Sequence, residues 1–332
     1  MKMKRAKAKQ KGFVIVLVLS MIGMLAVLLL GFNYKSRASL LAVDEFRKSQ
    51  QALNCATAGL NIAIAAIRGA EDISRNNKLA GLFSEETTFP VGDGSCSVNV
   101  TEDNGRLNLN LLIDKNGKPN RAGIDQLLRL IDSLNRPSEG TQERSCIGYG
   151  IVPAIIDWID NDDNVTCLDF VTRENLGAES DYYAGLDHPC QCRNGPLDTT
   201  EELLLVKGVT PQVFSRIREY VTVRGDGKVN INAASKTVIE SLSEKMDKVL
   251  AGVIVDRRKV GPFESIMELR DVPGMTDSVY YSIKDVITVS PAEQYYLVES
   301  CGSFERLSRT IAAVMRRDTQ TKTVDVLLYK EL

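Results

Sequence analysis

The sequence predicts an α+β protein, in which a long N-terminal helix packs on an antiparallel sheet and a large helical domain is inserted between strands of that sheet. Three observations predict this fold. The chain has no proline before Pro90, strand patterns occur before residue 111 and after residue 290, and helical patterns fill the 111–290 segment between them. Segments far apart in the chain are therefore expected to meet in one sheet.

The N-terminus combines a basic leader, residues 1–12, with an uncharged apolar run from Phe13 to Phe32. A helix of about 20 apolar residues can cross a bilayer core of roughly 30 Å, and the basic flank stays in the cytoplasm. We therefore expect a single membrane-spanning segment over residues 13–32, with everything that follows it translocated.

Three kinds of N-terminus fit this arrangement. A secretory signal peptide would be cut after the apolar run, for which Ser36-Arg37-Ala38 offers a site, although its apolar region usually has about 7–15 residues. A signal anchor would not be cut at all. Lys11-Gly12-Phe13 resembles a prepilin processing site, at which the leader ends in Gly12 and the mature chain begins at Phe13.

One helix is expected from Phe13 to about Arg68, because the segment is rich in Ala, Leu and Ile and poor in glycine. At 1.5 Å per residue, about 55 residues would span roughly 80 Å, with the first third in lipid. Beyond the membrane, apolar residues recur at three- and four-residue spacing on one face. This stripe consists of Leu53, Ala56, Leu60, Ile64 and Ile67.

Five segments have the residue pattern of strands, namely 95–101, 106–110, 295–301, 310–316 and 323–329. We expect them to form the sheet under the helix. The expected domain organisation is a basic leader 1–12, a membrane helix 13–32, the helix continuation with the first strands 33–110, an inserted α-domain 111–290, and the C-terminal strands 291–332.

The insert contains a weak internal sequence repeat. Residues 203–210 match residues 269–276 in pattern, and residues 105–110 match residues 227–232. The first pair looks like helix-hairpin-helix motifs, and the stretch 229–274 is similar to the domain of membrane-tethered DNA receptors of the competence type. Such a DNA receptor is the alternative function.

Helix-hairpin-helix motifs bind phosphate through backbone N–H groups at a glycine turn. Here Asp271 and Asp277 flank one turn, and Met246-Asp247 occupies the place where the other motif would need glycine. The formal net charge is −2, and removal of the six basic leader residues lowers it to −8. We therefore expect no binding to nucleic acid.

Seven cysteines in a translocated chain are expected to pair, and the odd number leaves at least one over. Cys55, in the long helix, is expected to be the unpaired one. The disulfide candidates are Cys96, Cys146, Cys167, Cys190, Cys192 and Cys301. His188 next to Cys190 and Cys192 could form a soft-metal site, but we expect those cysteines to be bridged instead.

No arrangement of residues recommends a catalytic site, so the chain is not expected to be an enzyme. The only histidine is His188, and the lone tryptophan, Trp158, lies in an apolar helix end where it is expected to be part of the core.

Acidic residues crowd at the end of an expected helix, 155–164, and again at 177–183. Crowded carboxylates repel one another unless a cation lies among them, and Ca²⁺ takes six to eight oxygen ligands. The pattern is not an EF-hand, because Val165 and Val171 occupy its glycine and glutamate positions. It leaves open a solvated helix end or a calcium site. The candidate ligands are Asp160, Asp162, Asp163, Glu179 and Asp181.

Motifs along nearly the whole chain resemble, in the same order, those of minor pseudopilin K of type II secretion systems. They are the Gly12-Phe13 junction, Leu17 in place of the pilin glutamate, and the segments 105–110, 157–160, 178–183, 194–208 and 229–232. The resemblance implies a pilin fold with a large α-domain inserted into its sheet, and bound calcium in that domain. It also implies processing and methylation by the prepilin peptidase, and an inner-membrane protein with its bulk in the periplasm.

The resemblance further implies a function in protein secretion at the tip of the pseudopilus, where the chain would initiate or cap the fibre and assist export of folded proteins across the outer membrane. The implied partners are minor pseudopilins I and J, other pseudopilins, the prepilin peptidase, inner-membrane proteins of the secretion system and exported substrates. The insert is too bulky to be repeated along a helically packed fibre, and the tip tolerates it.

Overall fold

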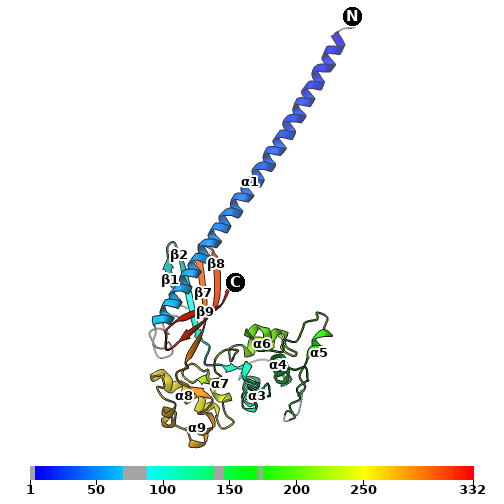
Figure 1. Ribbon diagram of the computed structural model, residues 1–332. Coiled ribbons are helices and arrows are strands. Elements are labelled where there is room, and N and C mark those ends of the chain that lie inside the picture. The colour runs from blue at the N-terminus through cyan, green and yellow to red at the C-terminus, as the bar shows by residue number, and fades with distance from the viewer. Residues whose placement is uncertain (1–3, 70–87, 138–145, 170, 172–174) are drawn as a thin grey trace.

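The computed structural model describes residues 4–69, 88–137, 146–169, 171 and 175–332. Its first element is one helix, α1 (Lys4–Gly69), which extends far from the rest of the molecule (Figure 1). Within it, the segment Phe13–Gly69 contains a stretch that is long and apolar enough to cross a membrane, with a mean hydropathy of 3.1. The predicted single long helix is therefore confirmed.

Five antiparallel strands form the sheet in the order β1-β2-β7-β8-β9. Their bounds are β1 Thr88–Val91, β2 Gly94–Glu102, β7 Glu293–Phe304, β8 Leu307–Asp318 and β9 Val324–Glu331. β2 and β7 come from opposite sides of the insert, yet they pair along their lengths from Ser95 with Ser303 to Glu102 with Tyr296. The expected α+β fold, with a helical domain inserted between strands, is confirmed.

The prediction for residues 106–110 is wrong, because this segment does not join the sheet. Only Leu107–Asn108 (β3) is a strand, and it pairs in parallel with β4 (Val221–Thr222) inside the α-domain. The side chain of Asn110 fixes the segment there by bonding to backbone groups of Leu197 and Val223. The sheet strands therefore end at Glu102 and resume at Glu293, and the predicted domain boundaries stay predictions.

The strand β1 is not among the expected strands, because its four residues include Pro90. Proline lacks a donor for the ladder and is tolerated on an edge strand. β1 is such an edge strand and pairs only with β2.

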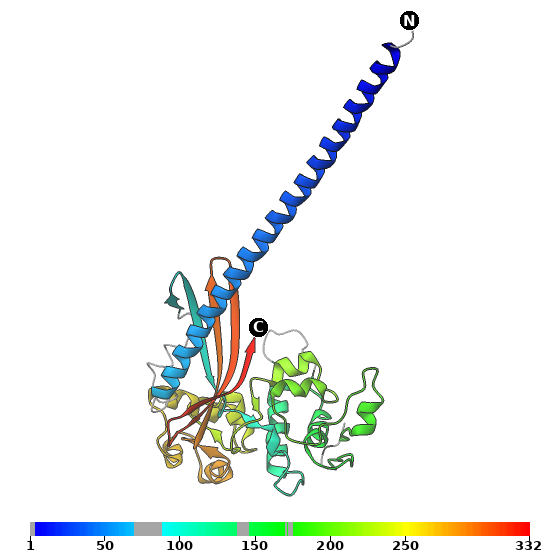
Figure 2. The same ribbon diagram turned by 45° about the horizontal axis from the view of Figure 1, so that its top comes forward.

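α1 lies against the sheet (Figure 2), and small residues at the contact let the two backbones approach closely. A side chain at Gly302 of β7 would overlap the carbonyl oxygen of Ala52 and the nitrogen of Ala56. The Ser300 hydroxyl donates to the Ala56 carbonyl over 2.7 Å. We call this contact the small-residue seam; it comprises Ala52, Cys55, Ala56, Gly59 and Ala63 of α1 with Gly94, Cys96, Ser300 and Gly302 of the sheet.

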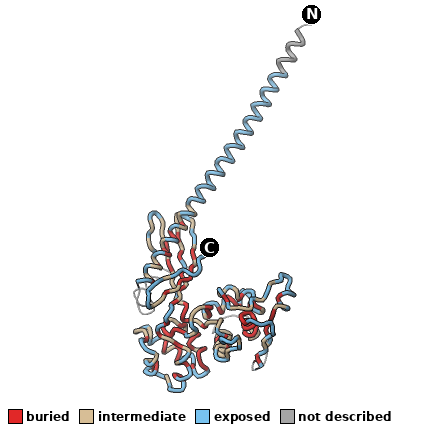
Figure 3. The backbone as a smooth tube through the Cα atoms, viewed as in Figure 1, coloured by how far each residue is buried: buried red, intermediate tan, exposed pale blue. Residues whose placement is uncertain are grey.

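Large apolar residues close the core around the seam. Of the predicted stripe, Ala56, Leu60 and Ile67 are buried against the sheet, while Leu53 and Ile64 are partly buried. Figure 3 shows buried residues only in the part of α1 that meets the sheet, whereas the remainder of the described helix is exposed.

The insert is a helical domain with its own core, separate from the core under α1. Its α-helices are α3 Arg121–Asn135, α4 Ile151–Ile159, α5 Ser180–Ala184, α6 Pro211–Ile217, α7 Lys236–Ser241, α8 Lys248–Val260 and α9 Asp277–Ile283. Short 3-10 helices are η1 Leu109–Leu111, η2 Thr200–Leu205 and η3 Ile266–Asp271. Besides β3 with β4, a second parallel pair joins β5 (Val229–Asn230) to β6 (Ile287–Thr288).

The two halves of this α-domain repeat one hydrogen-bond pattern. In the second half, the Asn232 side chain bonds to backbone groups of Phe263 and Val289. In the first half, the Asn110 side chain bonds in the same way to backbone groups of Leu197 and Val223. Thr199 with Glu202, and Ser265 with Glu268, form equivalent capping boxes at η2 and η3. The turns that follow contain Gly208 and Gly274, both with positive φ, 81° and 90°. The sequence repeats thus correspond to two copies of one unit.

The copies differ at one connection. Between α4 and η2 the first copy has residues 160–199, whereas between α8 and η3 the second copy has only residues 261–265. The two acidic clusters noted in the sequence, 155–164 and 177–183, lie at the end of α4 and in the longer connection that follows it.

The α-domain is joined to the sheet at the end of β2 and the start of β7, which lie side by side. The Asn104 side chain donates to the Glu293 carbonyl (2.9 Å) and accepts from the Tyr295 N–H (2.6 Å). Asp103, buried in the same junction, accepts a hydrogen bond from the Thr222 hydroxyl, and burial raises its pKa. Buried polar groups therefore join the two strand ends to each other and, through Thr222 of β4, to the insert.

Candidate metal centre

The acidic centre is built at the end of α4, a helix in which all nine residues are buried. Asp157 lies in its last turn with no exposed surface, and Asp160 follows its end with 5% exposed. Buried carboxylates cost free energy unless hydrogen bonds or an opposite charge compensate for the lost water. Two of them at the end of an otherwise apolar helix therefore require a partner.

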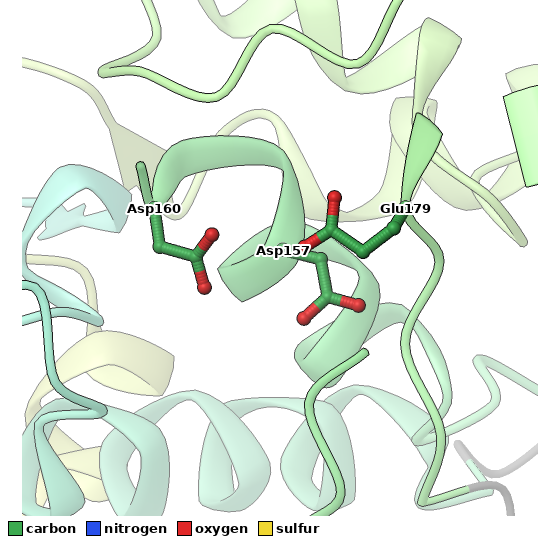
Figure 4. A group of neighbouring side chains, drawn as sticks. All are labelled: Asp157, Asp160 and Glu179. Carbon is green, nitrogen blue, oxygen red and sulfur yellow. The ribbon is translucent and has the colours of Figure 1, made fainter. Parts of the chain in front are cut away.

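Glu179 approaches these residues from the segment before α5 (Figure 4). One oxygen of each of Asp157, Asp160 and Glu179 lies within 4.8 Å of the other two, and we call these residues the carboxylate triad. Asp157 Oδ1 accepts a bond from the Thr166 N–H (2.9 Å). Asp157 Oδ2, Asp160 Oδ1 and both Glu179 oxygens are buried without a hydrogen-bond partner among the described residues.

Burial and mutual repulsion shift the protonation of the triad. Burial, followed by the charges of Asp162 and Asp157, raises the pKa of Asp160 to about 7. Burial, followed by the charges of Asp157, Asp160 and Asp163, raises the pKa of Glu179 to about 8. Burial also raises the pKa of Asp157. A divalent cation would remove this repulsion, and the unpartnered hard oxygens fit the ligand preference of Ca²⁺.

The structure brings together two of the five predicted ligands, Asp160 and Glu179. Asp162, Asp163 and Asp181 are exposed and lie outside the triad. Within its own loop, Asp162 Oδ1 accepts a hydrogen bond from the Asn164 N–H (2.8 Å). Asp163 Oδ1 accepts one from the N–H of Ser180, the first residue of α5 (3.4 Å). The charge of Asp162 helps to raise the pKa of Asp160, and the charge of Asp163 helps to raise the pKa of Glu179, so these two carboxylates add to the negative potential at the triad.

Sequence reasoning missed Asp157 of the triad and Asn194, which is bonded to the loop that follows Asp160. Asp157 has the signal that could have found it, an i,i+3 spacing to Asp160 at the end of an apolar helix. Asn194 has no such signal, because it lies 34 positions after Asp160 and 15 positions after Glu179 in the chain. Its Nδ2 donates to the Asp162 carbonyl (3.1 Å), and its Oδ1 is buried without a partner among the described residues.

The loop that carries Glu179 is packed tightly on α4. A side chain at Gly177 would overlap Asp157 Oδ2 and lie 2.8 Å from the Pro153 carbonyl oxygen. Lys207 Nζ donates to the Gly177 carbonyl (3.0 Å). The Trp158 ring is buried edge-on against that of Tyr183, at 5.0 Å between centroids, so Trp158 belongs to the core as expected.

All seven cysteines lie in the described residues, and all are free thiols. The expected pairing of Cys96, Cys146, Cys167, Cys190, Cys192 and Cys301 is therefore not found in this structure. Cys146 and Cys167 are exposed, and Cys190, Cys192 and Cys301 are partly buried.

The strand register explains why Cys96 and Cys301 do not pair, although they lie on neighbouring strands. Cys96 stands opposite Gly302, and Cys301 stands opposite Ser97, so the two cysteines point to opposite faces of the sheet. Cys55, expected to stand apart, is instead buried in the small-residue seam near Cys96.

We expect the affinity for calcium to fall as the pH decreases through about 8 and again through about 7, the pKa values of Glu179 and Asp160. Both folded-state values lie above the ordinary ones of 4.5 and 3.8, so the cation-free folded protein holds protons that a bound calcium ion would have to displace. For the same reason its stability should decrease as the pH rises from about 4 to about 8. Calorimetric titration in buffers of different ionisation enthalpy would measure both affinity and proton release, and a pH-independent affinity would contradict the assignment.

Protein-family models match two parts of this chain. The model for the type II secretion system (T2SS), protein K, matches residues 105–226, and the helix-hairpin-helix motif matches residues 225–288. The two matches meet between the copies of the repeated unit. The expected resemblance to protein K is therefore confirmed.

Curated relatives agree with this match. The type II secretion system protein K of Aeromonas hydrophila is 24% identical over 195 residues, which cover 57% of this chain and 54% of that protein. The protein K of Klebsiella pneumoniae is 24% identical over 237 residues, which cover 68% of this chain and 66% of that protein. The chain thus spans between half and two thirds of the length of these relatives.

Among solved structures, a chain of the GspK-GspI-GspJ complex from the enterotoxigenic Escherichia coli Type 2 Secretion System has a similar fold. The TM-score is 0.68 at 19% identity, and the match covers 88% of this chain and 99% of that chain. The likeness therefore includes both the sheet and the inserted α-domain.

Proposed function

We propose that this chain, which carries the protein K domain of type II secretion systems over residues 105–226, is a minor pseudopilin that works as a structural component and not as an enzyme. The observation that carries the proposal is the shared fold, which extends over 99% of a chain from the GspK-GspI-GspJ complex. A fold-wide match that includes an uncommon insertion is stronger support than a match to the pilin helix alone.

The shape of the molecule supports a place at the tip of the pseudopilus. α1 leaves the sheet at one end, and the α-domain lies at the other end, away from the membrane segment (Figure 1, Figure 2). A subunit stacked above this one in a fibre would meet the α-domain. The chain therefore suits a position that initiates or caps the fibre, from which it would assist export of folded proteins.

The expected partners are minor pseudopilins I and J, and the surface available to them includes α1. Every large apolar side chain from Phe13 to Phe46 on this helix is exposed. Lipid can cover the first part of that surface, and helices of neighbouring pseudopilins can cover the part that follows the membrane segment.

Calcium would have a structural function in this scheme. Asp157, Asp160 and Glu179 would hold the ion, with Asn194 Oδ1 as a further buried oxygen. Bound calcium would neutralise the triad and keep the connection 160–199 closed on α4, so that the α-domain presents one fixed surface.

The alternative, a membrane-tethered DNA receptor, is less well supported by the hairpins. Thr276 accepts from the N–H of Val279 (3.3 Å) at the start of α9, and Asp247 accepts from the N–H of Leu250 (2.7 Å) at the start of α8. These caps use backbone donors that a phosphate would need. Asp277 beside the second turn pairs with Arg270 (3.3 Å) and would oppose a phosphate.

A pull-down distinguishes the two functions. We expect the full chain, produced in membranes together with its cognate pseudopilins I and J and solubilised in detergent, to co-purify with both of them. The matched control replaces the cognate pair with a major pseudopilin alone, which should be retained less. Failure to retain I and J, together with DNA binding that weakens steeply with salt, would favour the DNA receptor.

We expect the mature chain to begin at Phe13, because the basic leader ends in Gly12 directly before the apolar run. Gly12→Leu should block cleavage, since a prepilin peptidase site requires a small residue there. Intact-mass measurement of the protein from cells with an active peptidase checks this prediction. A mature N-terminus at Ser39 would instead identify a secretory signal peptide.

A further inference from the structure

A thiol lies at the edge of the carboxylate triad. Cys192 Sγ is 3.6 Å from the carbonyl oxygen of Asp157, and the side chain is partly buried. Cys192 is also close enough to Glu179 for each side chain to influence the pKa of the other. Both Glu179 oxygens are buried without a hydrogen-bond partner among the described residues, which leaves them open to a cation at this edge of the triad.

The backbone on either side of Cys192 is tied to the elements that carry the triad. The N–H of Cys190 donates to the Tyr183 carbonyl in α5 (3.3 Å), and the N–H of Gly195 donates to the Trp158 carbonyl in α4 (3.5 Å). The thiol is therefore held beside the site by bonds before and after it in the chain. It is not a side chain on a free loop.

We propose that this centre also takes a thiophilic divalent cation, Zn²⁺ or Cd²⁺, with Cys192 and Glu179 among its ligands, in competition with calcium. Calcium takes oxygen ligands and gains nothing from sulfur, whereas zinc and cadmium bind thiolate and carboxylate together. The thiol lies outside the group of oxygens that are within 4.8 Å of one another, so the two ions would share Glu179 and not the whole ligand set.

The binding step is a ligand exchange without oxidation or reduction. The cation forms a bond to the Cys192 sulfur, the thiol proton leaves to solvent, and the carboxylates supply the remaining negative charge. The inference rests on the proposed use of the triad as a cation site, but it concerns a residue that calcium does not need.

Cadmium provides a direct test, because a cadmium–thiolate bond has a charge-transfer absorption in the ultraviolet and a cadmium–carboxylate bond does not. The full chain in detergent would be reduced, stripped of metal with a chelator and titrated with Cd²⁺. We expect the band to saturate near one equivalent for this site and to decrease when excess Ca²⁺ is added. Cys192→Ala should remove that component of the band.

Cys190→Ala is the matched control, because Cys190 lies in the same loop and is also partly buried. This variant should keep both the band and its sensitivity to calcium. Thermal unfolding and calcium titration of Cys192→Ala should match those of the unaltered chain, which shows that a lost band does not come from a lost fold.

A band that persists unchanged in Cys192→Ala, or that disappears equally in Cys190→Ala, overturns the proposal. The two assignments of the site fail in distinguishable ways. Calcium binding without the cadmium band leaves the calcium function intact and removes this inference. A cadmium band that depends on Cys192 in a chain that binds no calcium removes the calcium function and supports the thiophilic site.

Discussion

Replacement of Gly302 by valine is expected to destabilise the unit of α1 and the sheet by about 3 kcal/mol or more. A side chain at Gly302 would overlap backbone atoms of Ala52 and Ala56, which cannot rotate out of the way as a side chain can. The helix would have to move off the sheet, and the Ser300 bond to the Ala56 carbonyl would be lost with it.

Denaturant unfolding of the detergent-solubilised chain, followed by circular dichroism, measures this effect. Gly69→Val is the matched control, since Gly69 is the last residue of α1 and a Cβ atom added there would meet no other atom within 4 Å among the described residues. It should change stability by only a fraction of the Gly302→Val effect. Equal stability of Gly302→Val and the unaltered chain would contradict the close contact between Gly302 and the backbone of α1.

Removal of calcium is expected to have the second largest effect. At a hundredfold excess over its Kd, an ion that binds only the folded state stabilises it by about 2.7 kcal/mol. Chelation should lower the Tm accordingly and expose the connection 160–199 to protease, most strongly above about pH 8, where the carboxylates of the triad are ionised and repel one another. Thermal scans and limited proteolysis, each with and without chelator, measure both results.

Paired variants separate the triad from the exposed carboxylates around it. Asp160→Asn with Glu179→Gln should abolish the response to chelator, because the variant binds no ion and carries less repulsion. Asp162→Asn with Asp181→Asn should retain the response, since these residues lie outside the triad. The reverse result would show that the ion binds at the surface of the loop.

Much of the fold could be predicted because it depends on periodicity along the chain. Residues 95–101 alternate in polarity and residues 310–316 contain a short apolar run, and the two segments lie within the longer strands β2 and β8. Residues 106–110 alternate in the same way, but the pattern does not specify a partner strand, and side-chain bonds from Asn110 place them in the α-domain. Pairing between distant segments is a property of the assembled fold.

The candidate site could be predicted only in part, for a related reason. Carboxylate density identifies Asp160 and Glu179, but burial decides which carboxylates lack partners, and burial depends on how the loop closes. Asp157 Oδ2 and Asn194 Oδ1 are two further oxygens that are buried without a partner among the described residues, and carboxylate density does not single them out. Cysteine number likewise predicts pairing, whereas the register of β2 and β7 turns Cys96 and Cys301 away from each other.

The difference between the two copies in the α-domain has a practical consequence. The second copy closes its connection from α8 to η3 with residues 261–265, which include no metal-binding group of the triad, and it still forms the same asparagine bridges and capping box. The second copy is therefore complete without an ion, and most of the length of the connection 160–199 is an addition to the repeated unit. A variant in which the sequence of residues 261–265 replaces the connection 160–199 would be a shorter α-domain without the triad residues Asp160 and Glu179. With it, recognition by partners can be studied apart from metal binding.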